Sequence, residues 1–219
     1  MIIARIIAVA IGYACGLFET GYFYGKKKGV DIRTKGSGNS GATNTLRTFG
    51  WKAGLVTCLG DILKTVAAVL AVKLIFGRTY TEDIILLELY AGFGAVLGHN
   101  FPFYLKFKGG KGVATYLGMM LAIDWPVFLI FGITLVILSF LSNYIITGIF
   151  VSVIAYPIFI SAYYGDAVSA FIVSIASTIV LFKHRSNIQR FLHGEEYRIR
   201  QGLMKLIRSK DKTTTGDKQ

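Results

Sequence analysis

Three short segments of this chain mix glycine with hydroxyl, amide and basic side chains, and each could form part of a binding site for a phosphorylated molecule. They cover residues 36–47, 98–115 and 182–196. Glycine lets the backbone turn its amide N–H groups toward one point, while hydroxyl and amide side chains add donors and Lys or Arg supplies positive charge. This combination is suited to binding anions and to stabilising negative charge that develops during a reaction.

The first segment is a run of small polar residues. It reads Gly36-Ser37-Gly38-Asn39-Ser40-Gly41-Ala42-Thr43-Asn44-Thr45-Leu46-Arg47. We interpret it as a phosphate cradle, in which backbone amides, hydroxyls and the guanidinium group of Arg47 converge on one anion. The alternative is a flexible loop without a ligand, because linkers have the same composition.

The second segment places glycines on both sides of a lysine, directly before an apolar stretch. It contains Gly98-His99-Asn100-Phe101-Pro102 and Lys106-Phe107-Lys108-Gly109-Gly110-Lys111-Gly112-Val113-Ala114-Thr115. Glycine amides and the positive end of a helix that begins here would attract a phosphate, although the P-loop spacing G-x-x-x-x-G-K-[ST] is absent. Lys111 is the expected ligand. Lys106 and Lys108 have an alternative role as membrane-surface anchors that fix the topology.

The third segment follows the last apolar stretch. It reads Phe182-Lys183-His184-Arg185-Ser186-Asn187-Ile188-Gln189-Arg190-Phe191-Leu192-His193-Gly194-Glu195-Glu196. If the segment is helical, His184 and Asn187 share one face and reach one ligand together. The alternative, which applies most to Arg185 and Arg190, is a basic stretch that attracts anionic lipid.

Long apolar stretches must position these segments. Of the 219 residues 53% are hydrophobic, and the mean hydropathy is +0.56, which is too apolar for a soluble domain. A membrane-spanning helix needs about 20 apolar residues. The sequence therefore predicts an all-α polytopic integral membrane protein with seven transmembrane helices, the fourth of them short, at Ile2–Tyr24, Trp51–Phe76, Ile84–Leu105, Val113–Ile123, Pro126–Leu141, Ile145–Tyr164 and Ala167–Phe182.

Basic residues predict the orientation of these helices. Most of the 24 Lys and Arg residues lie after the first, third and seventh candidates, whereas the other loops carry Glu82, Asp83, Asp124 and Asp166. Since positive loops face the cytoplasm, we expect the N-terminus outside, the C-terminus in the cytoplasm and all three polar segments on the cytoplasmic side. We expect a membrane domain at residues 1–205 and a polar, basic, disordered tail at residues 206–219.

The net charge of +12 is typical of three classes: nucleic-acid binders, membrane-surface proteins and anion channels. A nucleic-acid binder would not need the membrane helices, so this class is excluded. A transporter or channel for an organic phosphate, or a lipid scaffold without chemistry, stays open as an alternative. A transporter would place polar residues at the membrane midplane and often shows inverted repeats. Here no repeat is found and the polar segments gather at one side, which favours a site for phosphorylated substrates at the membrane surface and leaves open whether that site is catalytic.

The three segments resemble the cytoplasmic motifs of the bacterial acyl-phosphate:glycerol-3-phosphate acyltransferases, the PlsY family. The matching residues are Ser37-Gly38-Asn39-x-Gly41-Ala42-Thr43-Asn44-x-x-Arg47, Gly98-His99-x-Phe101-Pro102 with Phe107-Lys108-Gly109-Gly110-Lys111-Gly112-Val113-Ala114-Thr115, and His184-Arg185-x-Asn187-Ile188-x-Arg190. The resemblance also covers Asp61-x-x-Lys64, the seven-helix topology and nearly all of the chain to about Glu196. It implies transfer of a fatty acyl group from acyl phosphate to the 1-hydroxyl of glycerol 3-phosphate, giving lysophosphatidic acid and phosphate as the first step of membrane phospholipid synthesis.

Two positions depart from the family pattern. The family often has Gly-Ser-Ile-Pro in its first helix, where this chain has Gly16-Leu17-Phe18-Glu19. We expect that the kink is lost here and an acidic group gained. An Arg-Tyr pair often follows the fifth helix of the family, and here it is Asn143-Tyr144. Both differences are expected to change local helix geometry and lipid contacts rather than the reaction.

The residues expected to act directly on the substrates are Ser37, Arg47, Lys111, His184 and Asn187. Further substrate and phosphate contacts are expected from Gly38, Asn39, Gly41, Thr43, Asn44, His99, Lys108, Gly109, Gly110, Gly112, Arg185 and Glu196. No His has an Asp five residues further on, so the H-x-x-x-x-D arrangement of other glycerol phosphate acyltransferases is missing. The general base is therefore either His184 or the phosphate of the substrate itself.

The remaining expectations concern groups outside the three segments. Asp61 and Lys64 lie three residues apart within a predicted helix, either as a mutually neutralising pair or as support for the basic site. Cys15 and Cys58 are interpreted as reduced packing residues. No metal or cofactor is expected, because no cluster of ligand-type residues lies in the cytoplasmic loops. The expected partners are acyl phosphate, glycerol 3-phosphate and membrane lipid in a bacterial inner membrane, and the soluble enzyme that supplies acyl phosphate is a candidate.

Overall fold

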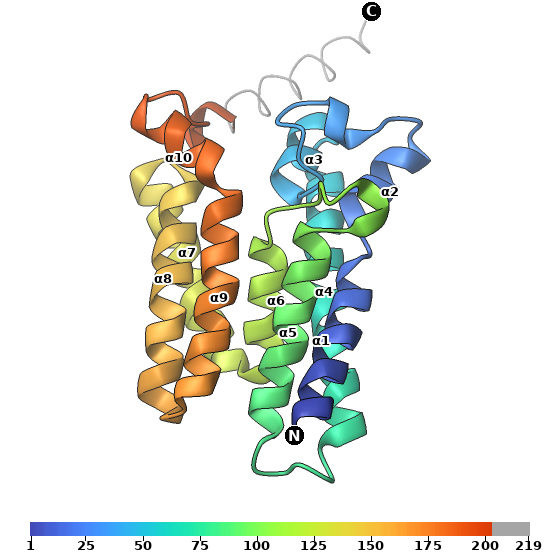
Figure 1. Cartoon of the computed structure of the whole chain (residues 1–219). Helices are drawn as coiled ribbons and strands as arrows, with labels where there is room; N and C mark the ends of the chain where they lie inside the picture. The colour runs from blue at the N-terminus through green and yellow to red at the C-terminus, as the bar shows by residue number, and fades with distance from the viewer. Residues whose placement is uncertain (203–219) are drawn as a thin grey trace, which may run out of the picture.

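The protein is a bundle of helices (Figure 1). The computed structural model describes residues 1–202, and within these residues the only β contact is one isolated bridge between Tyr144 and Arg198. The α-helices are α1 (Ile2–Gly16), α2 (Thr20–Lys27), α3 (Ala42–Phe49), α4 (Trp51–Phe76), α5 (Ile84–Asn100), α6 (Val113–Ile123), α7 (Trp125–Ser142), α8 (Ile145–Tyr164), α9 (Ala167–Lys183) and α10 (Arg185–Leu192), with short 3-10 turns η1 (Ile32–Thr34) and η2 (Phe103–Leu105).

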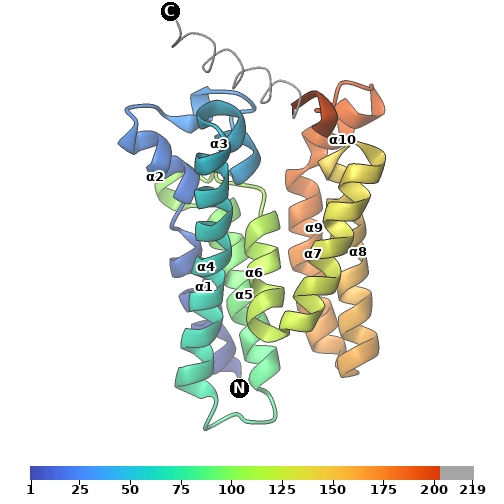
Figure 2. The same ribbon diagram turned by 180° about the vertical axis from the view of Figure 1, so that it is seen from behind.

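The helices form two groups that lie side by side (Figures 1 and 2). In the N-terminal group α1 packs on α5 and α4, and α4 also packs on α5 and α6. In the C-terminal group α8 packs between α7 and α9. Contacts of α5 with α9 and of α6 with α7 join the two groups. The amphipathic helices α3 and α10 lie at the same end of the two groups (Figure 1).

Small residues set the close packing of α1 against α5. A Cβ atom on Gly12 would lie 2.0 Å from the carbonyl oxygen of Ala91, and one on Gly94 would lie 2.3 Å from that of Val9. A Cβ atom on Gly98, which belongs to the second polar segment, would lie 2.2 Å from the carbonyl oxygen of Tyr13. Helices in a membrane approach closely where small residues face each other. Gly98 therefore serves helix packing.

Large apolar and aromatic side chains fill the space between the two groups. Tyr116 of α6, Phe131 of α7 and Tyr156 of α8 are buried together, with edge-to-face ring pairs 5.5 to 5.6 Å apart. The Tyr116 hydroxyl lies 2.5 Å from Ser177 Oγ on α9. The buried hydroxyl thus has the hydrogen-bond partner that burial demands.

The first predicted helix is broken, contrary to our expectation that its kink is lost. It ends at Gly16 and resumes as α2 at Thr20. The break is stabilised from the neighbouring helix α4, because Lys64 Nζ donates a hydrogen bond to the carbonyl oxygen of Phe18 (2.7 Å). The carboxylate of Glu19 accepts a hydrogen bond from Ser40 Oγ (2.5 Å). A buried acid and its partners therefore hold a bend that the sequence alone did not predict.

The number of spans is confirmed in part. Five helical stretches are long and apolar enough to cross a membrane, and α9 with α10 makes a sixth candidate with a 54° bend. The short helix α6 has 11 residues. Apolar side chains on the outer faces, such as Ile3, Leu74 and Leu141, are strongly exposed, as expected for contact with lipid. Seven spans and their orientation stay predictions, and the tail predicted at residues 206–219 lies outside the described residues.

Candidate active site

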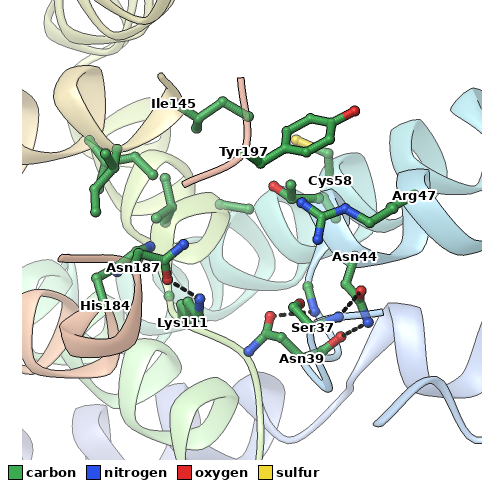
Figure 3. A pocket seen from close by; sticks show the side chains of 18 of the residues that line it. Ser37, Asn39, Asn44, Arg47, Cys58, Lys111, Ile145, His184, Asn187 and Tyr197 are labelled. Carbon is green, nitrogen blue, oxygen red and sulfur yellow. Dashed lines mark hydrogen bonds between the residues drawn. The ribbon is translucent and has the colours of Figure 1, made fainter. Parts of the chain in front are cut away.

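A cavity of about 530 Å³ lies between the two helix groups, at the end that carries α3 and α10 (Figure 3). All five residues expected to act on the substrates line it, together with Asn39, Gly41, Thr43, Asn44, His99, Gly112 and Glu196. The three polar segments, which are far apart in the sequence, therefore meet in one place.

Asn44 organises the first segment. Its Oδ1 accepts a hydrogen bond from the backbone N–H of Ser37 (2.8 Å), and its Nδ2 donates to the carbonyl oxygens of Asn39 (2.8 Å) and Lys35 (2.9 Å) (Figure 3). The Asn44 amide is thus fully used in folding the loop. Gly36 has φ +57°, and a Cβ atom there would lie 2.2 Å from Asn44 Oδ1. Asn44 therefore shapes the cradle, while Ser37 and Arg47 line the cavity.

The second segment is fastened to the first and to His99. Asn39 Nδ2 donates to the carbonyl oxygen of Gly109 (3.3 Å), and the Gly110 N–H donates to the carbonyl oxygen of His99 (3.0 Å). A Cβ atom on Gly110 would lie 1.9 Å from Nε2 of His99, so only glycine fits against this ring. Gly112 has φ +86° and directly precedes α6. These contacts fix the loop that carries Lys111 to the rim of the cavity.

Two helices begin at the cavity wall. Ala42 and Thr43 at the start of α3 line it, as do Val113 and Ala114 at the start of α6. The first N–H groups of a helix have no partner within the helix, and the helix dipole makes this end positive. By contrast, the amides of Gly38, Gly41 and Gly110 already donate to groups of the protein. The backbone N–H groups at the starts of α3 and α6 are therefore better suited to bind an anion than the N–H groups of these glycines.

His184 lies at the junction between α9 and α10 and is 4% exposed. Its Nδ1 lies 2.8 Å from the carbonyl oxygen of Val180, which can only accept, so Nδ1 carries the proton and Nε2 is an acceptor. Burial lowers the pKa of His184 to about 4. The imidazole is consequently neutral near pH 7, and a backbone carbonyl orients it where other enzymes use an Asp.

A chain of polar contacts runs from Lys111 into the third segment. The Lys111 ammonium donates to Asn187 Oδ1 (Figure 3). Asn187 Nδ2 donates to Glu196 Oε1 (2.8 Å), and Arg190 Nε donates to Glu196 Oε2 (2.9 Å). Burial, followed by the nearby charge of Arg190, lowers the pKa of Lys111 to about 8. Lys111 is therefore largely charged at pH 7 and sensitive to pH just above it.

Five residues predicted to bind substrate do not line the cavity. Gly38, Gly109 and Gly110 serve the fold of the loops. Lys108 instead lines a second, smaller cavity with Asp31 and Arg33. Arg185 points toward the ring of Phe182, with its guanidinium carbon 4.6 Å from the ring centre. Their part in binding stays a prediction that the geometry does not favour.

Several cavity residues were missing from the expected site. Arg190 belongs to the third motif, but the sequence left open whether it contacts lipid or the site; Cys58 was interpreted as a packing residue, and nothing in the sequence singled out Tyr197. One wall of the cavity is apolar, and its residues come from α6, α7 and α8: Leu117, Leu135, Ile145, Ile146 and Ile149. Because these side chains look like any other membrane-helix residues, only the fold reveals that they face the polar segments.

Next to the cavity lies a buried charged cluster formed by Glu19, Asp61, Lys64 and His99, whose side chains are each no more than 5% exposed. Lys64 Nζ lies 3.1 Å from Asp61 Oδ1. His99 Nδ1 lies 2.9 Å from both Lys64 Nζ and Glu19 Oε1. Thr20 Oγ1 donates to Asp61 Oδ1 (3.0 Å). The predicted pair of Asp61 and Lys64 is thus real, and it belongs to a larger network that reaches the cavity at Asp61 and His99.

Comparison with known proteins gives a consistent result. A family model described as glycerol-3-phosphate acyltransferase matches residues 6–194. The glycerol-3-phosphate acyltransferase of Bartonella henselae is 43% identical over 86% of this chain and 89% of its own, and that of Clostridioides difficile is 41% identical over 91% and 98%. The crystal structure of PlsY (YgiH), an integral membrane glycerol 3-phosphate acyltransferase, in its glycerol 3-phosphate form has a TM-score of 0.79 and 32% identity over 89% of this chain and 95% of its own. The lysophosphatidic acid form of that enzyme gives a TM-score of 0.76.

Proposed function

Because this chain belongs to the glycerol-3-phosphate acyltransferase family, we propose that it transfers a fatty acyl group from acyl phosphate to the 1-hydroxyl of glycerol 3-phosphate. The products would be lysophosphatidic acid and inorganic phosphate. Acylation of glycerol 3-phosphate follows from the family. The identity of the donor is the new part of the proposal, and it rests on the chemistry of the cavity.

One observation carries this proposal: the cavity joins a cationic end to an apolar wall. Arg47, Lys111 and the starts of α3 and α6 offer positive charge and N–H donors, while Leu117, Leu135 and Ile149 offer an apolar surface. Acyl phosphate has both parts, a dianionic head and a hydrocarbon chain, and glycerol 3-phosphate brings a second phosphate. A cavity with several cationic groups suits two phosphates held close together.

The reaction needs little help from acids or bases. The 1-hydroxyl oxygen forms a bond to the acyl carbonyl carbon, the bond from that carbon to the phosphate oxygen breaks, and the hydroxyl proton leaves with the phosphate as hydrogen phosphate. Phosphate is already a good leaving group, so positioning and stabilisation of the oxyanion are the main tasks. We assign these tasks to Ser37, Arg47, Lys111 and the helix-start amides, and their position on the cavity wall supports the assignment.

His184 is assigned to the glycerol 3-phosphate side together with Asn187. Its unprotonated Nε2 can accept a hydrogen bond from the substrate hydroxyl and orient it. With its pKa lowered to about 4, the imidazole is a poor acceptor of a full proton. A phosphate oxygen, with a second pKa near 6, is the better proton acceptor. This supports binding and orientation as the main role of His184.

We place the site on the cytoplasmic face of a bacterial plasma membrane. Helices α3 and α10, which belong to the first and third polar segments, lie at one end of the bundle (Figure 1), and most of the Lys and Arg residues up to residue 202 belong to these segments or the loops beside them, which supports this orientation by the positive-inside rule. The water-soluble partner that supplies acyl phosphate would then reach the cavity from the cytoplasm. A single cysteine introduced as Glu82→Cys should react with a membrane-impermeant reagent in intact cells, whereas Lys28→Cys should react only in opened cells. The reverse pattern would contradict this topology.

The donor is tested with the purified full chain in detergent. Glycerol 3-phosphate is supplied with palmitoyl phosphate, palmitoyl-coenzyme A or palmitoyl-acyl carrier protein, each with a chelator and without ATP. We expect lysophosphatidic acid and an equal amount of phosphate from palmitoyl phosphate alone. Lys111→Ala should lose most of this activity, and Lys108→Ala, a change of the same kind in the same loop, should keep it. Product from palmitoyl-coenzyme A but not from palmitoyl phosphate would overturn the proposal, as would a requirement for a divalent ion.

A further inference from the structure

The chain crosses back over the cavity after α10. Residues 195–202, which we call the strap, are separated from the end of α10 by two residues and reach the turn between α7 and α8. Glu195, Glu196 and Tyr197 of the strap line the cavity. The match to the acyltransferase family model ends at residue 194, directly before the strap.

The strap is fastened at both ends. At its start Glu196 accepts hydrogen bonds from Asn187 (2.8 Å) and Arg190 (2.9 Å). Further on, Arg198 Nε donates to the Tyr144 hydroxyl (3.2 Å). Asn143, at the end of α7, accepts from two strap amides: its carbonyl oxygen from Ile199 N–H (3.0 Å) and its Oδ1 from Arg200 N–H (2.9 Å). The asparagine at position 143, which departs from the family pattern, thus binds the strap through its side chain.

Between these two attachments Tyr197 meets Arg47. The guanidinium carbon of Arg47 lies 4.4 Å from the centre of the Tyr197 ring, as Figure 3 shows at the edge of the cavity. A guanidinium group that stacks on an aromatic face keeps its N–H groups free along its edge. Arg47 is exposed, and its guanidinium forms no ion pair with the acidic groups of residues 1–202. The ring is therefore the contact that holds an otherwise mobile cation at the cavity.

The same ring forms part of the cavity lining. Tyr197 is half-buried, its ring lies against Arg47 of the first polar segment, and the neighbouring Glu196 is bound by Asn187 and Arg190 of the third. Exclusion of water matters for an activated acyl donor, because water attacks the same carbonyl carbon as the substrate hydroxyl. Attack by water forms the carbon–oxygen bond of a fatty acid, breaks the same bond to phosphate and releases hydrogen phosphate without an ester.

We propose that Tyr197 is a positioning residue that sets the specificity of the reaction: by stacking on Arg47 and covering the cavity, it directs acyl phosphate to glycerol 3-phosphate instead of water. This inference rests on acyl phosphate being the donor, as proposed above. It predicts that the strap controls how the donor is divided between transfer and hydrolysis. A residue that served only folding would change the total rate and leave this ratio unaltered.

The experiment measures both products from palmitoyl phosphate with the purified full chain. Lysophosphatidic acid reports transfer, and phosphate released in excess of it reports hydrolysis. In Tyr197→Ala we expect the ratio of transfer to hydrolysis to fall by about 2- to 30-fold, the range that corresponds to the loss of one cation–π contact. Tyr197→Phe keeps the ring and should keep the ratio of the wild type. Tyr163→Ala, at the opposite end of α8 and 65% exposed, is the matched control for loss of a tyrosine.

Arg198→Ala provides a second approach if Tyr197→Ala does not fold, since Arg198 is exposed and only anchors the strap. It should lower the ratio in the same direction, by a smaller factor. An unchanged ratio of transfer to hydrolysis in Tyr197→Ala would overturn the inference. If Tyr197→Ala does not fold, an unchanged ratio in Arg198→Ala would overturn it. A fall in Tyr197→Phe as large as that in Tyr197→Ala would also overturn it. If the wild type releases no phosphate from palmitoyl phosphate, the donor proposal fails first, and this outcome is distinct from a failure of the strap.

Discussion

The cavity and the buried charged cluster contain similar side chains but use them in opposite ways. In the cluster, Lys64 is satisfied on several sides: by Asp61 (3.1 Å), by His99 and by the carbonyl oxygen of Phe18. In the cavity, Lys111 contacts a neutral amide and Arg47 stacks on a ring. Charge that is paired within the protein holds helices together, and charge that meets only neutral partners is left for a charged ligand.

The largest expected effect concerns the cluster. Lys64→Met removes the cation that Asp61 and the Phe18 carbonyl require, and it leaves buried carboxylates without compensation. We expect the free energy of unfolding to fall by about 3 to 5 kcal/mol. Chemical denaturation in detergent, followed by circular dichroism, measures this change. The same substitution at the exposed Lys108 serves as the control, and a loss below about 1 kcal/mol in Lys64→Met would show that the cluster is not a structural unit.

Substitutions in the cavity should lower the activity and leave the free energy of unfolding unchanged. Arg47→Ala and Lys111→Ala each remove a charge-assisted contact to phosphate, which is worth about 1.5 to 3 kcal/mol, or roughly 10- to 150-fold in kcat/KM. Their unfolding curves should match that of the wild type. Near-normal kinetics in either folded variant would mean that the residue only anchors the protein at the membrane surface.

Most of this architecture could be predicted, because long apolar stretches and polar segments are local patterns. The bounds of α4, α6 and α8 agree with the predicted stretches at Trp51–Phe76, Val113–Ile123 and Ile145–Tyr164. The convergence of the three segments was also expected. The break before Thr20 could not be predicted, because it depends on Lys64 and Ser40, which come from other parts of the chain. Tyr197 and the apolar wall were missed for the same reason: their roles follow from which elements meet in space.

The activity should depend on pH through Lys111, which lines the cavity. Because the pKa of Lys111 is lowered to about 8, this side chain is positively charged below that pH and loses its charge above it. The KM for the phosphate substrates should therefore rise about tenfold per pH unit above pH 8. Lys111→Arg stays charged throughout this range and should lack the alkaline rise. An identical alkaline limb in both proteins would assign it to another group.

A smaller effect is expected from His184→Ala. If the imidazole orients glycerol 3-phosphate, its loss removes one neutral hydrogen bond and raises the KM for this substrate by about 2- to 12-fold. Steady-state kinetics as a function of pH measures this change, and the wild type should keep an acid limb near pH 4 from the lowered pKa of His184. An unchanged KM with kcat lowered by about three orders of magnitude would instead identify His184 as the general base.

The smallest effect is expected at Lys108, which carries the same charge as Lys111 three residues earlier. It lines the second cavity and not the first. Lys108→Ala should change kcat/KM by less than about twofold, because an exposed charge is well screened by solvent. A loss as large as that of Lys111→Ala would mean that the loop rearranges when substrate binds.

The order in which the chain supplies the cavity has a consequence for its biosynthesis. Arg47 comes from the first quarter of the chain and Lys111 from its middle, whereas His184, Asn187 and the strap come from its end. Membrane helices are inserted as the ribosome produces them, N-terminal segments first. A nascent chain can therefore assemble helices α1 to α6, with the buried charged cluster complete, before its active site is complete. Partly synthesised copies in the membrane would consume no activated fatty acid, and separately expressed halves that meet there should restore the missing chemistry.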